Sequence, residues 1–570
     1  MNKRVQPILL KPSTCIKEAM RTMEEGKYKN PPAPAGIGLV VDKKGRLLGV
    51  VTDGDIRRAI LKDMSTADPV SIIMAKNPLR IVNTSSPKDM LVKLYYEIKK
   101  RNAPEDKYHH IVVVDEHDTV EDVVTPFELW RRSEVRVKNV AIIGLGYVGL
   151  TLALSLNELG IKVFGIDTDN KVIGKIESGA AHFYEKGLDV LLQKHIHKDL
   201  FVKTNLAKNE SDIYVICVGT ATDGKNRIML APLKKAARAV GRALKTQDLV
   251  ILRSTVVIGT CRRIVIPILE KESGMKAGRD FFVAFAPERT VEGRALEELR
   301  TLPQIIGAYN KQSLDATAQL FQPLASTIVT VSSLEAAEAI KLLNNSFRDI
   351  SFSFANEVSQ ICNGFGLNTI EVIRAANEGY PRDRIPYPSP GVGGSCLVKD
   401  PYILIESARK VRYAAQLPIV ARAINKGMID FVYKKVHAFC VKNKKDPARV
   451  KIFLMGMAFK GEPETSDIRA STSVEILKKL QVKYKHIVVY DPIAKKEELQ
   501  GLGTRVTSSP TQGCRGADCV LVLTNHRSFR DLDVYGLAKS MNSPGFFFDG
   551  WSIFTKNEFA SLKHIIYESI

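Results

Sequence analysis

The chain has 570 residues, of which 45% are hydrophobic and 25% are charged. This is the balance of an ordinary folded protein with several domains, and it excludes a mostly disordered, collagen-like or coiled-coil chain. No apolar run reaches the roughly 18 residues of a membrane span, and the first residues lack the apolar stretch of a signal peptide. No membrane partner is therefore expected.

Lys and Arg number 83 against 62 Asp and Glu, which gives a net charge of +21. Such an excess suits anionic ligands such as nucleic acids, a membrane surface or phosphorylated metabolites. The charge is spread along the chain, and its densest cluster, at 442–445, has no aromatic residue between its lysines. Nucleic-acid binding calls for a concentrated basic stripe, so no nucleic-acid partner is expected.

The eight cysteines are sparse and form no CxxC pair of the zinc-binding type. In so long a chain they are typical of reduced thiols in a cytoplasmic protein, and one of them could act as a nucleophile. No metal site is expected.

The first block, residues 1–135, contains two similar patterns, at 36–60 and 110–132. Each is an apolar strand, an Asp-containing turn, a second apolar strand, a threonine and the start of a helix. The duplication indicates two copies of one small α+β motif packed together. A charged linker follows at 131–138.

The remaining blocks differ in architecture. Residues 136–325 alternate helices with strands that are continuous apolar runs, as expected of a parallel sheet covered on both faces. Residues 326–445 are mostly helical, with apolar residues at a spacing of three to four, and residues 446–570 return to alternation. The expected fold class is α/β, with two Rossmann-like parallel-sheet domains joined by a central helical domain and preceded by the α+β pair.

The second block opens with a dinucleotide-binding fingerprint. A strand leads into Gly144-x-Gly146-x-x-Gly149, a helical pattern follows, and a second strand ends at Asp167. Gly144 permits the tight turn, Gly146 lets the backbone approach a pyrophosphate on the helix N-terminus, and Gly149 allows close helix–strand packing. The Asp167 carboxylate can accept from a ribose 2′-hydroxyl and repels a 2′-phosphate, which favours NAD over NADP.

The segment PSPGVGGSCLVKDPYIL, at 388–404, places Cys396 after glycines and before Lys399 and Asp400. A substrate can approach such a cysteine closely, and its reactive thiolate form needs a cation or a helix N-terminus nearby. Asp400, four residues on, shares a helical face with Cys396 if a helix begins here. The alternative is a packed cysteine in a turn.

Three more polar residues are candidates for the same chemistry. Lys341 and Asn345 stand four residues apart in an expected helix, so an ammonium and an amide could donate together to a developing oxyanion. Glu288 follows an expected strand. The alternatives are a solvated lysine and a solvated or helix-capping carboxylate.

Seven motifs follow one order between about 138 and 555: GLGYVG (144–149), VGTATD (218–223), RSTVVIGT (253–260), APERTVEG (286–293), KLLNNSF (341–347), GVGGSCLVKDP (391–401) and GMAFKGEPETSDIR (456–469). Together they resemble the UDP-glucose/GDP-mannose dehydrogenase family, the NAD-dependent nucleotide-sugar 6-dehydrogenases.

The resemblance implies a double oxidation. A primary alcohol at C6 of the sugar loses a hydride to NAD and becomes an aldehyde, to which the cysteine adds as a thiohemiacetal. A second NAD takes another hydride, and water hydrolyses the resulting thioester to the uronate. The thiol traps the reactive aldehyde, and fixed donors stabilise the oxygen that becomes negative.

Matching of motif positions implies the catalytic roles. Cys396 is the expected nucleophile. Lys341 and Asn345 are expected to hold the oxyanion, while Asp400 supports proton transfer or orients the hydrolytic water. The positions near the reacting sugar and water are those of Glu288 and Thr222.

The same matching implies the binding residues. The residues expected to meet NAD are Gly144, Gly146, Tyr147, Val148, Gly149, Asp167, Thr220 and Thr255. The residues expected to meet the UDP-sugar are Glu288, Glu292, Lys341, Asn345, Gly393, Phe459, Lys460 and Arg469. The last domain has Gly456-Met457-Ala458 in place of a full glycine fingerprint, so it should hold UDP rather than a second NAD. The central helix is expected to pair two subunits, in a homodimer or a higher homo-oligomer.

Two positions depart from common patterns of the family. Ala221 stands where many members have proline, and Ser395 stands where many have histidine or proline. The segment around Cys396 looks closer to the dehydrogenases of UDP-N-acetylhexosamines, although GGSC followed by KD also occurs in the UDP-glucose group. The expected substrate is UDP-ManNAc or UDP-GlcNAc, and UDP-glucose is the alternative.

The paired pattern in 1–135 resembles a CBS domain pair, an adenine-nucleotide-binding regulatory module. Its best match, GVVTDGDIRRA at 49–59, puts Thr52 and Asp55 where the module binds ribose, and such a pair can also cap a helix. The second copy has Thr125 but Glu128 in place of Asp. An assembly module without ligand is the alternative. For the whole chain, the competing function is an inactive dehydrogenase that serves as an adenine-nucleotide-sensing binding protein.

Overall fold

The computed structural model describes residues 2–26, 28, 29, 31, 33–83, 90, 97, 110–125, 139–223 and 226–570. The chain divides into two compact units, Met1–Lys138 with Gln319–Thr327, and Asn139–Ala318 with Ile328–Ile570. The expected linker at 131–138 and Glu128 lie outside the described residues.

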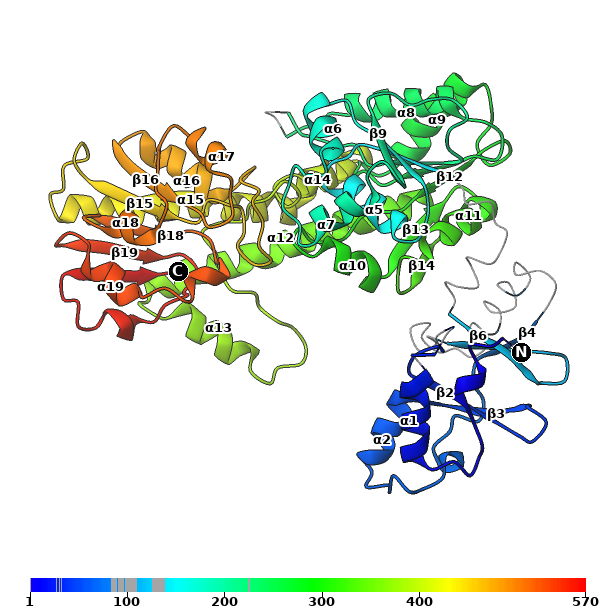
Figure 1. Ribbon diagram of the computed structural model, residues 1–570. Helices are drawn as coiled ribbons and strands as arrows, with labels where there is room; N and C mark the ends of the chain where they lie inside the picture. The colour runs from blue at the N-terminus through cyan, green and yellow to red at the C-terminus, as the bar shows by residue number, and fades with distance from the viewer. Residues whose placement is uncertain are drawn as a thin grey trace. The chain divides into compact units, whose positions relative to one another are not determined.

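Within the described residues of the first unit, two three-stranded sheets repeat one pattern (Figure 1). In each sheet the first two strands are parallel and the last two form an antiparallel hairpin. The two hairpins also share a register shift, at Val40/Val41 and at Val113/Val114. The duplication predicted from the sequence is therefore present in the strands. The elements are β1 (Leu9–Leu10), α1 (Ile16–Gly26), β2 (Ile37–Val41), β3 (Leu47–Thr52), α2 (Asp53–Ile60), β4 (Arg80–Val82), β5 (Ile111–Val114) and β6 (Val120–Val124).

The second unit begins, within 139–223 and 226–331, with an eight-stranded sheet whose neighbours are all parallel except β12 and β13. Its order is β14 (Ile328–Val331), β13 (Gln304–Ala308), β12 (Phe282–Phe285), β11 (Leu249–Leu252), β10 (Ile213–Ile216), β7 (Val140–Ile143), β8 (Val163–Ile166) and β9 (Leu200–Lys203).

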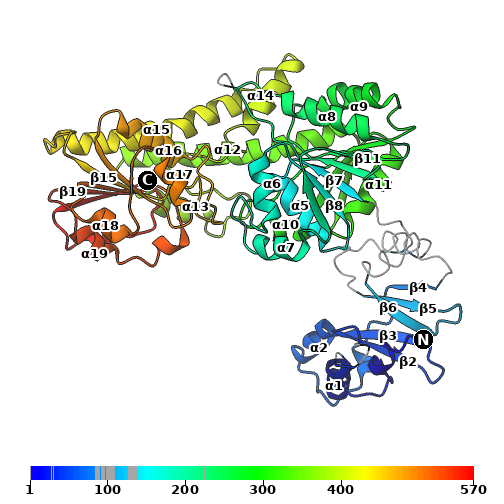
Figure 2. The same cartoon turned by 45° about the horizontal axis from the view of Figure 1, so that its top comes forward.

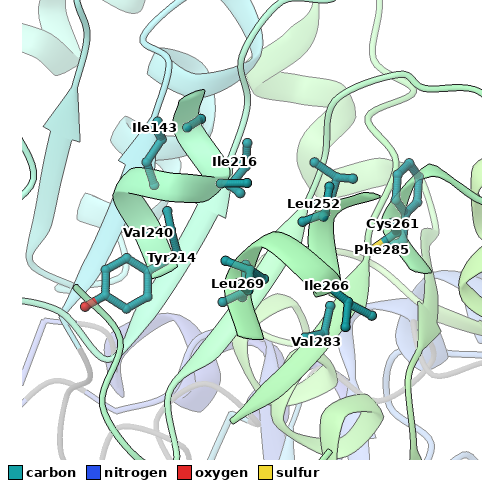
Figure 3. Packing of buried hydrophobic residues seen from close by; sticks show 14 of the residues in the cluster. Ile143, Tyr214, Ile216, Val240, Leu252, Cys261, Ile266, Leu269, Val283 and Phe285 are labelled. Atoms are coloured by element: carbon teal, nitrogen blue, oxygen red, sulfur yellow. The ribbon is translucent and has the colours of Figure 1, made fainter. Parts of the chain in front are cut away.

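The helices of this part follow the strands in alternation: α5 (Tyr147–Asn157), α6 (Asn170–Glu177), α7 (Leu188–His195), α8 (Ala231–Ala243), α9 (Ile266–Ser273), α10 (Ala295–Thr301) and α11 (Lys311–Phe321). Strands β7, β8, β10 and β11 are buried along their whole length, as their continuous apolar runs predict. Figure 3 shows α8 and α9 closing one face, where Val240 and Leu269 lie over Tyr214 and Val283.

The central helices are α12 (Leu334–Gly364), α13 (Thr369–Asn377), α14 (Asp400–Lys410) and α15 (Gln416–Lys442). The long helices α12 and α15 pack together and run from the eight-stranded sheet to the six-stranded sheet (Figures 1 and 2). The Ser333 side chain caps α12 by accepting from the Ala336 N–H. None of the described helices is long and apolar enough to cross a membrane.

The last part, 451–570, is described throughout and forms a six-stranded parallel sheet. Its order is β17 (Arg505–Val506), β16 (His486–Tyr490), β15 (Lys451–Met455), β18 (Cys519–Val522), β19 (Gly545–Asp549) and β20 (Ile565–Ser569). Its helices are α16 (Thr472–Gln481), α17 (Lys496–Gln500), α18 (Pro510–Cys514) and α19 (Val534–Lys539). Strands β7–β12 and β15–β20 are both ordered 3-2-1-4-5-6, the Rossmann order, in which ligands bind where the order reverses.

Candidate active site

The turn between β7 and α5 has the shape that its three glycines predict. Gly144 has φ +96°, and a Cβ there would lie 3.0 Å from the backbone of Cys217 and Val218. A Cβ on Gly149 would lie 1.8 Å from the Gly144 carbonyl oxygen, whereas nothing lies within 4 Å of that position on Gly146. The outer face of the turn is therefore open, and the residues present fit a pyrophosphate at the N-terminus of α5.

Asp167 follows β8 and its carboxylate faces this turn. Oδ2 accepts from the Leu145 N–H at 2.8 Å, and Oδ1 accepts from the Asp169 N–H at 3.0 Å. Since a carboxylate oxygen has two lone pairs, each oxygen keeps one acceptor position. The side chain thus fits the predicted bond from a ribose 2′-hydroxyl.

The Tyr147 hydroxyl points into the protein. It hydrogen-bonds with the Glu185 carboxylate and lies 3.1 Å from the Val291 carbonyl oxygen, while the Gly293 N–H donates to the same carboxylate at 2.7 Å. Residues 291–293, which we call the strap, are thereby tied to the start of α5. Because the hydroxyl is engaged inside the protein, only the backbone of Tyr147 is left for the predicted cofactor contact. Val148, the next residue, is half-buried.

Cys396 is the exposed member of the eight free cysteines, all of which are described. It lies in a turn before α14, which begins at Asp400 rather than ahead of the cysteine. The Asp400 N–H donates to the Cys396 carbonyl at 2.8 Å, the spacing of one helical turn. The expected shared helical face is therefore replaced by a single turn that closes onto the helix.

The glycines before Cys396 pack against the last domain. A Cβ on Gly393 would lie 2.8 Å from the Ala470 carbonyl oxygen, and one on Gly394 would lie 2.8 Å from the Phe459 ring. The Gly394 N–H donates to the same carbonyl of Ala470 at 3.1 Å. The absence of side chains at these positions lets Phe459 approach the loop that carries the thiol.

Polar groups from three segments meet beside this loop. Asn345 donates its amide to Asp400 Oδ2 at 2.6 Å. Lys399 Nζ lies 3.5 Å from Asp400 Oδ1 and donates to Thr220 Oγ1 at 3.1 Å. Lys341 is buried, and its ammonium makes no hydrogen bond or ion pair to another described residue. Nothing in the local sequence distinguishes Lys399 from a solvated lysine apart from its place in the motif at 391–401.

The pKa of the Cys396 thiol is raised. Desolvation raises it most and the Asp400 carboxylate raises it further, while the charges of Lys341 and Lys399 lower it without cancelling these effects. Two cations therefore lie near the thiol, as its reactive form requires, but desolvation and Asp400 outweigh their effect on its pKa in the free protein.

Glu288 is buried and its carboxylate is fully engaged. The Arg253 guanidinium binds Oε2, and the N–H groups of Arg289 and Thr290 both donate to Oε1 at 2.7 Å. Burial raises its pKa, but Arg253, the Thr290 N–H and Lys341 outweigh that effect and the pKa is lowered. Glu288 is thus a fixed anion facing Lys341, and Arg253 is a site residue that sequence spacing does not reveal.

Glu292 on the strap lies against the last domain. Lys460 Nζ donates to the Glu292 carbonyl at 2.6 Å. Burial and then Asp467 raise the pKa of the Glu292 carboxyl to about 7, against Lys460 and Arg469, and burial lowers the pKa of Lys460 to about 8. The Arg469 guanidinium pairs with Asp467 at 2.7 Å.

The three threonines predicted as site residues in 136–325 differ in placement. The Thr220 hydroxyl donates to the Thr255 carbonyl at 2.6 Å and accepts from Lys399, so both threonines adjoin the nucleophile loop. Thr222 forms an isolated β-bridge with Ile228. Its side chain makes no hydrogen bond to another described residue, so the structure does not join it to the other site residues in this way.

The turn after β15 differs from the dinucleotide turn. Gly456 keeps the positive φ, +88°, but Met457 and Ala458 replace the other glycines. Both N–H groups donate to Asp491 Oδ2, at 2.6 and 2.8 Å. An internal carboxylate therefore accepts from two N–H groups of this turn, whereas Asp167 accepts from one N–H of the dinucleotide turn.

In the first unit, Thr52 and Asp55 form a reciprocal capping box at the start of α2. Asp55 Oδ2 accepts from the Thr52 N–H at 2.9 Å, and Oδ1 pairs with Arg58 at 2.7 Å. The predicted helix cap is confirmed. The second-copy Thr125 is described, whereas Glu128 is not.

Models of known families match four parts of the chain. They are the UDP-glucose/GDP-mannose dehydrogenase family NAD binding domain at 138–325, its central domain at 335–427, its UDP binding domain at 453–556, and a CBS domain at 1–62.

Individual relatives agree with these matches. The UDP-N-acetyl-D-mannosamine dehydrogenase of Pyrococcus horikoshii is 32% identical over 404 residues, 70% of this chain and 93% of the relative. A solved UDP-D-ManNAc dehydrogenase from that organism superposes with a TM-score of 0.69 at 31% identity, over 76% of this chain and 99% of the other. A UDP-glucose dehydrogenase from Pyrobaculum islandicum reaches 0.66 at 26% identity, over 76% and 97%. The chain belongs to the UDP-glucose/GDP-mannose dehydrogenase family of NAD-dependent nucleotide-sugar dehydrogenases.

Proposed function

We propose that the chain oxidises the C6 hydroxyl of a UDP-N-acetylhexosamine, UDP-ManNAc or UDP-GlcNAc, to the carboxylate in two NAD-dependent steps. The observation that carries the proposal is the exposed Cys396 thiol, held one turn from Asp400 beside Asn345 and Lys341. The relative of 32% identity that is named for UDP-N-acetyl-D-mannosamine supports the choice of sugar.

The residues of this chain divide the chemistry between them. NAD, when bound, accepts the hydride that leaves C6 in each step. The Cys396 sulfur adds to the aldehyde between those steps, and the thiol proton passes to Asp400, whose buried Oδ1 makes no hydrogen bond to another described residue. The Asn345 amide and the Lys341 ammonium donate to the oxygen that becomes negative, and Asp400 orients the water that hydrolyses the thioester.

The nucleotide sugar is held by the last domain and the strap. Phe459 packs on the nucleophile loop, Lys460 and Arg469 supply positive charge for a diphosphate, and both cations act on the Glu292 carboxyl. The Asp491 carboxylate at the β15 turn supports this arrangement because it already accepts from the N–H groups of Met457 and Ala458, which are then not available to a second dinucleotide. Glu288 supports the site indirectly as the anion that faces Lys341.

The proposal extends to assembly and regulation. Exposed apolar side chains follow α12 at heptad spacing and support a homodimer through this face: Leu343, Phe347, Phe354, Ile361 and Phe365. The capping box at Thr52 and Asp55 supports an adenine-nucleotide site in 1–135, with 136–325, 326–445 and 446–570 as the NAD, dimerisation and UDP-sugar domains. The eight free thiols support a cytoplasmic location, which cell fractionation would check.

A panel of UDP-sugars tests the function. The wild-type chain should reduce two NAD per UDP-ManNAc or UDP-GlcNAc and form the uronate, while Cys396→Ala should lose the second oxidation and release no uronate. Faster turnover of UDP-glucose than of either N-acetylhexosamine would make UDP-glucose the substrate, as in the name of the Pyrobaculum enzyme. No NAD reduction with any sugar would favour the inactive, nucleotide-sensing protein, and uronate formation by Cys396→Ala at the wild-type rate would exclude the covalent route.

A further inference from the structure

We propose that His526 and Asp491 are positioning residues for the nucleotide-sugar site. Together they fix the dipeptide Phe459–Lys460, which we call the arm, and thereby set the affinity for the UDP-sugar. The inference rests on the proposed function only in assigning the arm to the nucleotide sugar.

Asp491, directly after β16, is surrounded by donors. Its Oδ2 accepts from the N–H groups of Met457 and Ala458, and its Oδ1 accepts from those of Ile493 and Ala494 at 2.9 and 2.8 Å. His526 Nε2 lies 3.1 Å from Oδ2, and both side chains are fully buried. The equivalent Asp167 of the first sheet accepts from one N–H of its glycine turn. Asp491 therefore has a structural role, and it holds the β15 turn by more hydrogen bonds than Asp167 makes to the glycine turn.

The segment 524–526 holds the arm from its other side. The Thr524 hydroxyl donates to the Ala458 carbonyl at 3.2 Å, and the Gly461 N–H donates to Asn525 Oδ1 at 3.0 Å. A Cβ on Gly461 would lie 2.2 Å from the His526 nitrogen, so the two backbones touch. Both residues that flank the arm, Ala458 and Gly461, are thus bound to the segment 524–526, and Ala458 is also bound to Asp491.

The other contacts of the arm lead to the reacting groups. The Phe459 ring packs on Gly394, two residues before the thiol, and Lys460 Nζ donates to the Glu292 carbonyl. A shift of the arm would therefore displace its grip on the nucleotide sugar before it affected the NAD turn, which lies in the other sheet.

The His526 imidazole packs edge-on against Phe529 and has one hydrogen-bond partner among the described residues, Asp491. Within 451–570, which is described throughout, His526 Nδ1 is buried without a hydrogen-bond partner while Nε2 meets Asp491. A buried polar atom left unpaired opposes folding, so core packing alone would favour an apolar side chain here. The hydrogen bond to Asp491 explains the histidine, because it fixes the carboxylate that binds the turn before the arm.

The test compares His526→Leu with His526→Gln in the full-length chain. Leucine removes the donor, whereas the glutamine amide nitrogen can occupy the place of Nε2. His526→Leu should raise the KM for the UDP-sugar and the Kd for UDP, measured by calorimetry, about tenfold, the loss of one hydrogen bond to a charged group. The KM for NAD should stay within about twofold, and His526→Gln should restore the wild-type values.

His195 provides the matched control. This buried histidine in the first sheet domain contacts Glu158 and Asp199, away from the arm. His195→Leu should leave the KM for the UDP-sugar and the Kd for UDP unchanged. Unchanged values in folded His526→Leu, or a parallel rise of both KM values as in a general loss of structure, would overturn the proposal. If the wild type turns over no UDP-sugar, the proposed function fails, and the Kd for UDP still decides whether His526 positions the arm.

Discussion

The free protein keeps its nucleophile as a thiol. Desolvation and Asp400 raise the pKa of Cys396 against the two lysines, so alkylation by iodoacetamide should become fast only at alkaline pH. Lys399→Met removes a charge that lowers this pKa and should move the alkylation midpoint to still higher pH, whereas Asp400→Asn should move it down. Mass spectrometry of the peptide that contains Cys396, alkylated over a pH series, gives the midpoints.

Lys410, at the exposed end of the same helix, serves as the control for Lys399. Lys410→Met should leave the midpoint in place. A wild-type midpoint below that of a free thiol, or a downward shift in Lys399→Met, would show that the thiol is activated before substrate binds.

At the scale of single elements, α12 carries two opposite faces. Its buried face holds Lys341 and Asn345, and its outer face exposes the apolar row defined above, of which Phe347 is 72% exposed. Phe347→Glu combined with Phe354→Glu places charges in the proposed dimer interface and should raise the dissociation constant of the dimer on the order of 100-fold. Light scattering over a dilution series measures the mass.

Val482, at the end of α16, is the matched apolar control because it is exposed and lies away from this row. Val482→Glu should leave the mass of the assembly unchanged. A monomeric wild type, or a double variant that dissociates no more readily than Val482→Glu, would rule out this face as the interface.

The local spacing of apolar residues was sufficient to predict most helices and strands, but it did not predict how they contact one another. The apolar runs of β7 and β10 and the spacing of α12 depend on near neighbours, which is why they could be read in advance. The antiparallel pairing of β12 with β13 depends on the path of the chain between them. The loop before α14 is likewise bound to a residue far along the sequence, since the Gly394 N–H donates to the Ala470 carbonyl, and no local pattern predicts such a contact.

At the scale of the whole molecule, the site residues show the same limit. Motif positions named Cys396, Asn345 and Asp400, and the structure brings them together. Motif positions could not reveal that Arg253 neutralises Glu288 or that His526 supports Asp491, because each pair is joined only by folding. The pKa of the thiol also escaped prediction, since desolvation depends on everything that surrounds it.

The N-terminal unit allows a prediction about regulation. The full-length chain, with NAD saturating its dinucleotide site, should give a calorimetric binding signal with ATP, ADP or AMP. Asp55→Ala should weaken that binding about tenfold or more, because it removes the carboxylate proposed to meet the ribose. Asp533→Ala removes an N-cap aspartate of α19 in the last domain and should leave nucleotide binding intact. If none of the three nucleotides gives a binding signal with the wild type, the adenine-nucleotide site is ruled out and residues 1–135 are an assembly module without ligand.

The strap, residues 291–293, is hydrogen-bonded on two sides. On one side Tyr147 and Glu185 hold it to the helix that begins at the dinucleotide turn, and on the other side Lys460 holds the carbonyl of Glu292. This segment of three residues is therefore a structural element that the dinucleotide side and the nucleotide-sugar side have in common. Reciprocity then requires that whatever oxidant occupancy does to sugar affinity, sugar occupancy does to oxidant affinity by the same factor.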